Sequence, residues 1–258
     1  MTTLDAKANA HLAAMDGRIK PIKALRAFLA LMRNKEDSAQ VVHFRTSVDG
    51  PWYEPMIERF KADPRGRAIL DRGVWLFDVL SDQDYLLSLP EGSLGRVFVD
   101  ELIERGLTPQ GLRDADIEAQ DLSLLGEEGA FVHYRLLDMH DLLHTITGFG
   151  RDPLGEICIV EFQGVQFGSR GFRLLSHMAI LEIVRRFPDT PALKCVREAN
   201  RMASNAVWLA TADWESLLPL PIEDVRRTLN ITPSPTYSSV HDIWQERDLL
   251  LQREMAAA

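Results

Sequence analysis

Residues 172–187 read FRLLSHMAILEIVRRF, a run of strong helix formers that ends at Pro188. Leu, Met, Glu and Arg lose little side-chain freedom in a helix, whereas a proline cannot continue one. This stretch therefore predicts a long helix. A second long helix is predicted over residues 191–211 (PALKCVREANRMASNAVWLAT), because a proline at its start suits the first turn.

The same signals recur on the N-terminal side of this stretch. They predict helices over 22–33 after Pro21, over 84–89 with Ser81 or Asp82 as the cap, over 94–105 between Ser93 and Gly106, and from Thr108-Pro109 onward. Residues 157–160 (ICIV) fit a strand, but they lie in a segment without turns, 155–167, so we favour a helix there. Hairpin signals flanked by alternating hydrophobic residues are missing from the sequence. We therefore predict an all-α protein with a single helical domain.

The sequence divides into three expected parts. Residues 1–20 form an N-terminal extension, 21–232 the helical domain, and 233–258 a linker with an extra C-terminal helix. The linker follows from the proline-containing TPSPT at 232–236. The helix follows from residues 239–255, which place apolar side chains on one face, and we expect it to dock on the domain or on a second copy of the chain in a homodimer. Those side chains are Val240, Ile243, Trp244, Leu250 and Leu251.

Composition argues against nucleic-acid binding and indicates where the protein works. The 258 residues carry a net charge of −9, which argues against a nucleic-acid-binding protein because such proteins need a concentrated basic face. Cys158 and Cys195 cannot form a disulfide framework, which favours a reducing, cytoplasmic compartment. The sequence has no secretory apolar segment near residue 1 and no run of about 18 to 20 apolar residues. A protein of this kind that works at a membrane lies on its surface.

The chemistry is concentrated in residues 140–144, His-Asp-Leu-Leu-His. On a helix, His140, His144 and Asp141 lie at about 0°, 40° and 100° around the axis, so two imidazoles and a carboxylate share one side. Tyr134 lies on that side too. Apolar residues occupy the other side, so the helix is expected to be buried on both faces. A divalent metal would satisfy the buried polar atoms.

A fourth candidate ligand, Glu156, follows His144 after the turn-rich segment 148–153. That segment is long enough to reverse the chain and bring Glu156 over the same face. Two imidazoles with carboxylates suit Zn²⁺ ahead of Fe²⁺ or Mn²⁺. The spacing is similar to that of the HExxH zinc-protease helix, but Asp141 stands in place of its Glu. This difference weakens the case for an unrelated metallohydrolase. Asp141 is then either a metal ligand or a residue that anchors the ligands from beside them.

The string HDLLH-x11-E at 140–156 resembles the signature of the family of the fourth coenzyme Q biosynthesis protein. The resemblance covers roughly residues 20 to 232, and further matches are GSLGR at 92–96, YR at 134–135, LGE at 154–156 and ADWE at 212–215. It implies an all-helical fold and zinc bound by His140, Asp141, His144 and Glu156. Eukaryotic members carry a mitochondrial presequence; this sequence shows none, which suggests a bacterial member in the cytoplasm, peripheral on the inner membrane.

The resemblance also implies an activity. We favour an enzyme that removes the C1 carboxylate of a polyprenyl-hydroxybenzoate, with hydroxylation at that carbon, and Tyr134 is the only further side chain nominated for the site, although it also fits a structural aromatic. The alternative is a non-catalytic isoprenoid-lipid-binding protein that organises the ubiquinone-synthesis complex around a structural zinc. Either way the expected partners are a prenylated lipid, other ubiquinone biosynthesis proteins and the membrane surface.

Overall fold

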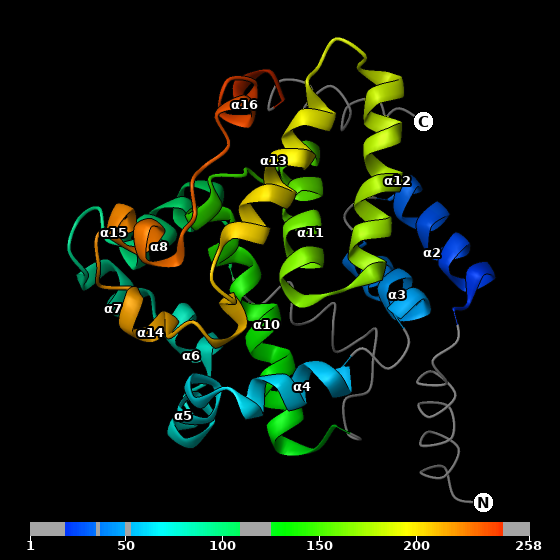
Figure 1. Ribbon diagram of the computed structural model, residues 1–258. Coiled ribbons are helices and arrows are strands. Elements are labelled where there is room, and N and C mark those ends of the chain that lie inside the picture. The colour runs from blue at the N-terminus through cyan, green and yellow to red at the C-terminus, as the bar shows by residue number, and fades with distance from the viewer. Residues whose placement is uncertain (1–18, 35–36, 50–52, 109–124, 245–258) are drawn as a thin grey trace, which may run out of the picture.

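The computed structural model describes residues 19–34, 37–49, 53–108 and 125–244 (Figure 1). Across these ranges the regular structure is helical, apart from a single β-bridge between Ser93 and Pro221, so the all-α prediction is confirmed. The helices are α2 (Pro21–Arg33), α3 (Ser38–Asp49), α4 (Tyr53–Ala62), α5 (Pro64–Arg72), α6 (Leu76–Ser81), α7 (Gln83–Ser88), α8 (Leu94–Arg105), α10 (Gly126–Thr147), α11 (Pro153–Phe167), α12 (Arg170–Arg186), α13 (Ala192–Asn205), η2 (Leu209–Thr211), α14 (Trp214–Leu217), α15 (Ile222–Leu229) and α16 (Pro235–Ser238).

Two helices, α10 and α11, hold the centre of the molecule. α11 packs between α12 and α13, and α10 runs through the middle with α4, α6 and α8 against it (Figure 1). Leu142, Leu143 and Ile146 of α10 are fully buried, as are Cys158 and Phe162 of α11. Each large aliphatic side chain buried in this way contributes about 1.5–3 kcal/mol. The segment 155–167 is thus a core helix, as predicted, and the strand alternative at 157–160 is wrong.

Local capping signals placed several helices correctly. The Asp82 side chain accepts a hydrogen bond from the Tyr85 amide at 2.9 Å and caps α7. Ser93 caps α8 through the Arg96 amide, and Gly106 ends that helix with φ of 64°. Such signals act within one helical turn, which is why sequence alone finds them. The helix predicted from Thr108-Pro109 lies outside the described residues.

The helix predicted over 191–211 is too long, because α13 ends at Asn205. Beyond it, the backbone bonds to other elements: the Val207 amide donates to the Leu229 carbonyl at 3.0 Å, and the Leu209 amide donates to the Gln166 side chain at 2.9 Å. The Trp208 indole also donates to the Gln166 carbonyl. These distant partners replace helical hydrogen bonds, and a local pattern cannot reveal them.

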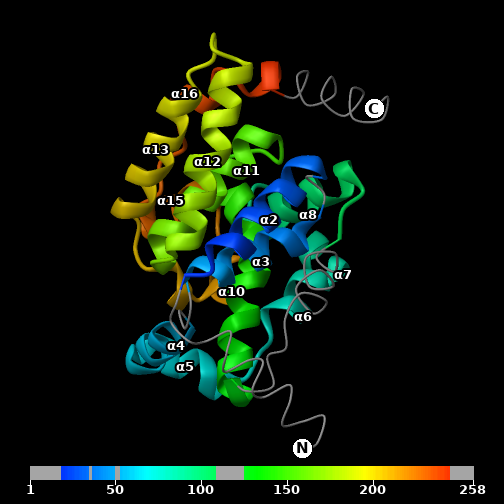
Figure 2. The same ribbon diagram turned by 90° about the vertical axis from the view of Figure 1, so that its right-hand side faces the viewer.

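The apolar interior is divided into two clusters. The main cluster extends from α4 through α10, α11 and α13 to Trp244. A smaller one, here called the α2–α3 cluster, contains Ala24, Ala27 and Leu31 of α2, Phe44 and Val48 of α3, and Leu175 of α12. Figure 2 shows α2 and α3 together in front of the α10–α12 region. Every helix in the described ranges falls short of what crossing a lipid bilayer would require.

The C-terminal segment lies against the body of the molecule. Residues 241–244 form a further helical turn after α16, and Tyr237 and Trp244 are buried in the main cluster. Ile243 is exposed, whereas Leu250 and Leu251 lie outside the described residues. The expected domain limits at residues 20 and 232 stay a prediction.

Candidate metal centre

The long helix α10 carries both histidines of the predicted site. It ends at Gly148, whose φ of 75° allows the chain to turn sharply out of the helix. His140 and His144 are one turn apart near this end, so their rings project in the same direction. The His144 side chain is 3% exposed and that of His140 is 18% exposed.

A short loop, residues 148–152, brings the carboxylate to these rings. Asp152 caps α11 by accepting hydrogen bonds from the Leu154 and Gly155 amides at 3.1 and 3.0 Å, and Pro153 occupies the first turn. Glu156 then lies in the first turn of α11, where a negative charge is stabilised by the helix dipole. The tight reversal that the glycines and the Asp-Pro pair predicted is therefore present.

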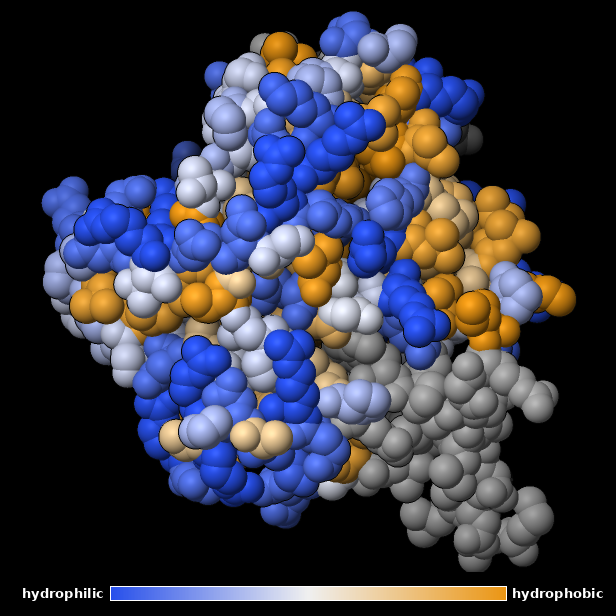
Figure 3. All heavy atoms as spheres, in the orientation of Figure 1, coloured by the Kyte–Doolittle hydropathy of each residue, from blue (hydrophilic) through white to orange (hydrophobic). Residues whose placement is uncertain are grey.

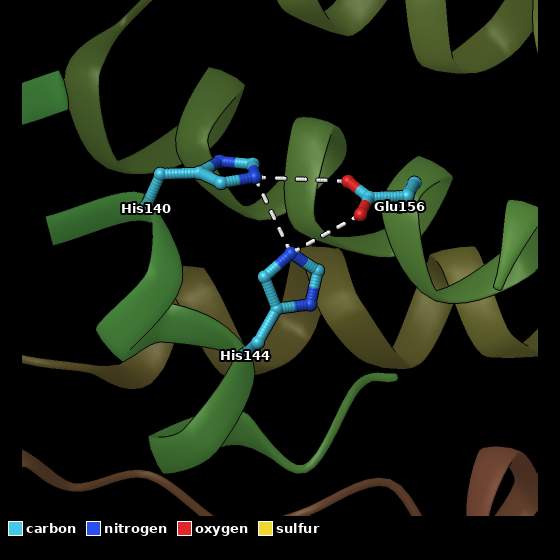
Figure 4. A group of neighbouring side chains, drawn as sticks. All are labelled: His140, His144 and Glu156. Carbon is cyan, nitrogen blue, oxygen red and sulfur yellow. Dashed lines mark hydrogen bonds and ion pairs between the residues drawn. The ribbon is translucent and has the colours of Figure 1, made fainter. Parts of the chain in front are cut away.

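His140, His144 and Glu156 converge on one point (Figure 4). The Glu156 carboxylate lies 3.7 Å from the His140 Nε2 and 3.4 Å from the His144 Nε2. The two Nε2 atoms are 3.3 Å apart. One ligand atom from each residue lies within 4.8 Å of the others, a spacing that a single cation can bridge.

Hydrogen bonds behind the rings aim both Nε2 lone pairs at that point. The His144 Nδ1 is 2.9 Å from the Phe149 carbonyl, and the His140 Nδ1 is 3.3 Å from the Gln163 side-chain oxygen. Both partners are acceptors, so each Nδ1 carries the proton and each Nε2 is left as an acceptor in the neutral ring. Two such acceptors facing a carboxylate need a cation or added protons between them. The donor set therefore fits a divalent metal.

The electrostatics of the cluster agree with this. Burial by itself would raise the pKa of Glu156, but the two adjacent imidazoles outweigh it and hold that pKa well below its usual range. Burial would likewise lower the pKa of His140, but the Glu156 carboxylate outweighs it and raises that pKa. The centre thus favours positive charge beside a carboxylate that stays ionised, which is what a metal ion requires of its ligands.

Asp141 does not join the three converging residues. Its carboxylate accepts a hydrogen bond from the Arg151 guanidinium at 2.5 Å, and both side chains are mostly buried. The pair ties the loop 148–152 back onto α10. This arrangement corresponds to the anchoring role that the sequence left open for Asp141 beside the ligand role.

Tyr134 lies away from the three converging side chains along α10. It precedes His140 by six residues, about 9 Å along the helix axis. Its ring contacts Trp75 and His133, with centroids 6.2 and 5.3 Å away. Its role in the site remains a prediction.

Sequence reasoning missed two residues that support the ligands. Gln163 follows Glu156 by seven residues on α11, which is two helical turns, so helical periodicity could have found it. Asp152 was noted only as part of the loop, although Asp before Pro is a common helix start. Cys158 and Cys195 are free and buried, and burial raises the pKa of both thiols, that of Cys195 to about 12. They are inert members of the core.

Comparison with known proteins relates the chain to one family of proteins. The family model described as "Coenzyme Q (ubiquinone) biosynthesis protein Coq4" matches residues 19–235. A Mus musculus protein named "Ubiquinone biosynthesis protein COQ4 homolog, mitochondrial" is 35% identical over 180 residues, which are 70% of this chain and 65% of that protein. A Scheffersomyces stipitis protein named "Ubiquinone biosynthesis protein COQ4, mitochondrial" is 26% identical over 70% of this chain, and the match spans 56% of that protein's length.

A solved structure supports the fold. The crystal structure of a putative ubiquinone biosynthesis protein from Nostoc punctiforme covers 82% of this chain and 98% of its own, with a TM-score of 0.59 and 20% sequence identity. At that identity the likeness concerns the fold alone. The family match covers most of the chain, including all three residues that converge at the candidate metal centre. The chain belongs to the Coq4 family, whose members are involved in coenzyme Q (ubiquinone) biosynthesis.

Proposed function

We propose that the chain is a Zn²⁺-dependent enzyme of ubiquinone biosynthesis that removes the C1 carboxylate of a polyprenyl-hydroxybenzoate, with hydroxylation at that carbon. The observation that carries this proposal is the convergence of His140, His144 and Glu156 on one point. Catalytic zinc sites usually have three protein ligands and an open position, whereas structural sites are closed by four. Because Asp141 is engaged by Arg151, the centre has three ligands among the residues that the structure describes, which supports catalysis over a structural zinc.

The residues around the centre have separate roles in this proposal. Gln163 and the Phe149 carbonyl hold the two imidazoles in the ligating tautomer. The Glu156 side chain is 41% exposed, so the centre can be reached from its side. A bound Zn²⁺ would supply Lewis-acid stabilisation for negative charge on the ring substituents. Fe²⁺ and Mn²⁺ are the alternative metals, and Tyr134 is kept as a candidate catalytic group.

The overall reaction breaks the bond between C1 and the carboxyl carbon and releases carbon dioxide. Placing a hydroxyl group on C1 is a two-electron oxidation relative to simple decarboxylation. The balance closes with water and an oxidant of the dioxygen class: water supplies the hydroxyl oxygen, and dioxygen takes up the two electrons and two protons and leaves as hydrogen peroxide. In this proposal the side chains of the centre bind the substrate and stabilise its negative charge, whereas the oxidant is added separately in the assay.

An exposed apolar face supports a position on the membrane surface. Ile22, Leu25 and Leu29 of α2 are all exposed, and Leu181 of α12 is 66% exposed. Figure 3 shows hydrophobic atoms gathered on the side of the molecule where α2 and α12 lie. The charged residues of α2 are all basic, although the chain as a whole carries −9. An apolar face with basic neighbours fits an anionic leaflet.

Turnover and metal content test the enzyme proposal together. The purified full chain should contain about one equivalent of zinc and convert a prenylated hydroxybenzoate in the presence of dioxygen. His144→Ala should lose metal and turnover, whereas His177→Ala, an exposed position on α12, should keep both. Metal and extractable lipid without turnover would overturn the enzyme proposal in favour of the lipid-binding organiser. A parent protein that contains no metal would overturn both the enzyme proposal and the lipid-binding organiser with its structural zinc.

Vesicle sedimentation tests the membrane proposal. The double variant Leu25→Glu/Leu29→Glu should release the protein from anionic phospholipid vesicles, because it places two negative charges on the exposed face of α2. The double variant Val74→Glu/Ile103→Glu is the matched control, since it adds the same two charges at similarly exposed side chains, between α5 and α6 and on α8. Equal binding of both variants would contradict the assignment of this face.

A further inference from the structure

A tyrosine beyond the family match reaches the loop that organises the metal centre. The match ends at residue 235, and Tyr237 follows two residues later with its side chain buried. Its hydroxyl accepts a hydrogen bond from the Gly150 amide at 2.9 Å and donates one to the Asp152 carboxylate. The His241 Nδ1 lies 3.0 Å from the same oxygen. One hydroxyl group thus connects two residues of the loop 148–152.

Both loop residues bonded by Tyr237 lead directly to a candidate ligand. Gly150 is bonded to Phe149, whose carbonyl fixes the His144 ring. Asp152 uses its other carboxylate oxygen to cap α11, and the Glu156 amide donates to the Asp152 carbonyl at 2.9 Å. A shift of the loop would therefore change the angle of one imidazole and the start of the helix that carries the carboxylate.

Tyr237 has little room to move in this position. A Cβ atom added at Gly150 or at Gly155 would lie 2.7 or 2.8 Å from its oxygen. The Phe149 ring packs edge-on against the Tyr237 ring, with centroids 5.2 Å apart. Burial, followed by the charge of Asp152, raises the pKa of Tyr237, so its hydroxyl keeps the proton that it donates.

The segment that carries Tyr237 is fixed to a different part of the molecule. The hydroxyl groups of Ser234 and Thr236 donate to the Glu198 carboxylate of α13 at 2.5 and 2.6 Å. Seven residues after Tyr237, Trp244 is fully buried and packs edge-on against Phe187. The segment around Tyr237 is therefore also held from α13 and from Phe187, at points outside the loop 148–152.

We propose that Tyr237 is a positioning residue for the metal centre: it clamps the loop 148–152 so that His144 and Glu156 face the same point. The inference rests on the metal centre of the proposed function, but not on the reaction catalysed there. It also gives the residues after 235 a function that the family match does not cover.

Metal affinity of Tyr237→Phe tests the proposal, because this change removes only the hydroxyl group. The full chain would be stripped with a chelator and titrated with Co²⁺, whose visible absorption reports ligand geometry. Loss of a group that orients metal ligands typically weakens metal binding about 10- to 100-fold. Since Tyr237 acts through the loop, we expect about a 10-fold loss, together with a changed Co²⁺ spectrum.

Ser176→Ala is the matched control for a general loss of stability. It removes a buried hydrogen bond from a hydroxyl group to the Glu161 carboxylate, farther along α11 than Glu156. Co²⁺ affinity in this variant should stay within about twofold of the parent value. Urea unfolding of all variants would show that they are folded under the titration conditions.

The titration results distinguish the metal centre itself from the positioning role of Tyr237. Parent protein that takes up neither Co²⁺ nor Zn²⁺ overturns the centre and the positioning role together. Parent protein that binds metal, with Tyr237→Phe binding it equally well or Ser176→Ala losing as much affinity, overturns only the positioning role. If Tyr237→Phe does not fold, Thr236→Val replaces it, because it loosens the segment from Glu198 without touching the loop. Unchanged affinity in that variant would overturn the proposal, and about a threefold loss would support it.

Discussion

The substitution Glu215→Gln is expected to destabilise the protein far more than a typical change at an ion pair. Arg135 lies on α10, the helix that carries His140 and His144, and its side chain is 0% exposed. Its guanidinium donates to both Glu215 oxygens at 2.7 and 3.0 Å and to the Ala212 carbonyl at 2.9 Å. Glu215, 15% exposed, is the only carboxylate bonded to it among the described contacts.

The expected loss follows from what remains after the change. Glutamine keeps one acceptor for Arg135 but turns an amide group toward the second guanidinium nitrogen, so one hydrogen bond and the countercharge are lost. Breaking a buried pair in this way costs about 3–5 kcal/mol, because the remaining charge is uncompensated. For a chain of this size, each kcal/mol lost from the free energy of unfolding lowers the melting temperature by about 2 °C, so the melting temperature should fall by roughly 6 °C or more.

Urea unfolding followed by circular dichroism would measure the loss, with two comparisons. Asp71→Asn breaks the exposed pair between Arg67 and Asp71, whose side chains are 46% and 62% exposed, and should leave the stability nearly unchanged because solvent screens the pair. The double variant Arg135→Met/Glu215→Leu should be more stable than Glu215→Gln, because apolar residues leave no buried charge. A cost below about 1 kcal/mol for Glu215→Gln, or a double variant less stable than the single one, would refute the reasoning.

Three further predictions concern the loop, an ion pair and the metal. In Gly155→Ala the new Cβ would lie 2.0 Å from the Gly150 carbonyl oxygen. We therefore expect the free energy of unfolding, measured by thermal unfolding, to fall by about 3 kcal/mol and metal binding to weaken. A variant as stable as the parent would contradict the tight packing of the loop. Burial acts to raise the pKa of Asp213, but the two hydrogen bonds from Arg72 outweigh it and lower that pKa to about 2. The ion pair therefore stabilises the fold at a pH above 3.8, the usual pKa of the Asp carboxyl group, and this stabilisation is lost as the pH falls through 2. Asp213→Asn should cost under about 1 kcal/mol at pH 7. The difference in unfolding free energy between this variant and the parent, measured by urea unfolding, should disappear as the pH falls through 2. Zn²⁺ at about 100 times its dissociation constant should add about 2.7 kcal/mol to the stability of the metal-free protein in calorimetry, and His144→Ala should abolish that gain.

Much of the candidate centre could be predicted because its geometry is local. The i, i+4 spacing of His140 and His144 fixes their common direction, and the loop that follows is too short to carry Glu156 far away. Asp141 shows the limit of this reasoning. Its position about 100° around the helix from His140 allowed either role, and what engages it is Arg151, in a loop whose path no helical pattern describes.

The contacts that sequence could not reveal are those between distant segments. Tyr237 and Asp152 are 85 residues apart in the chain, and Arg135 and Glu215 are 80 residues apart. The early end of α13 has the same cause, since Gln166 captures the backbone at Leu209 from another helix. Helix existence is a property of neighbouring residues, whereas these pairings arise only when the helices pack.

The separate α2–α3 cluster has a consequence for how the molecule opens. A unit with its own small apolar interior can unfold locally at a lower free energy than the central helices. Backbone amides of α2 and α3 should therefore exchange with deuterium well before those of α10 and α11. The apolar face of α2 can then adapt to whatever it contacts while the histidine rings keep their places, so that the outer surface and the centre respond on different timescales.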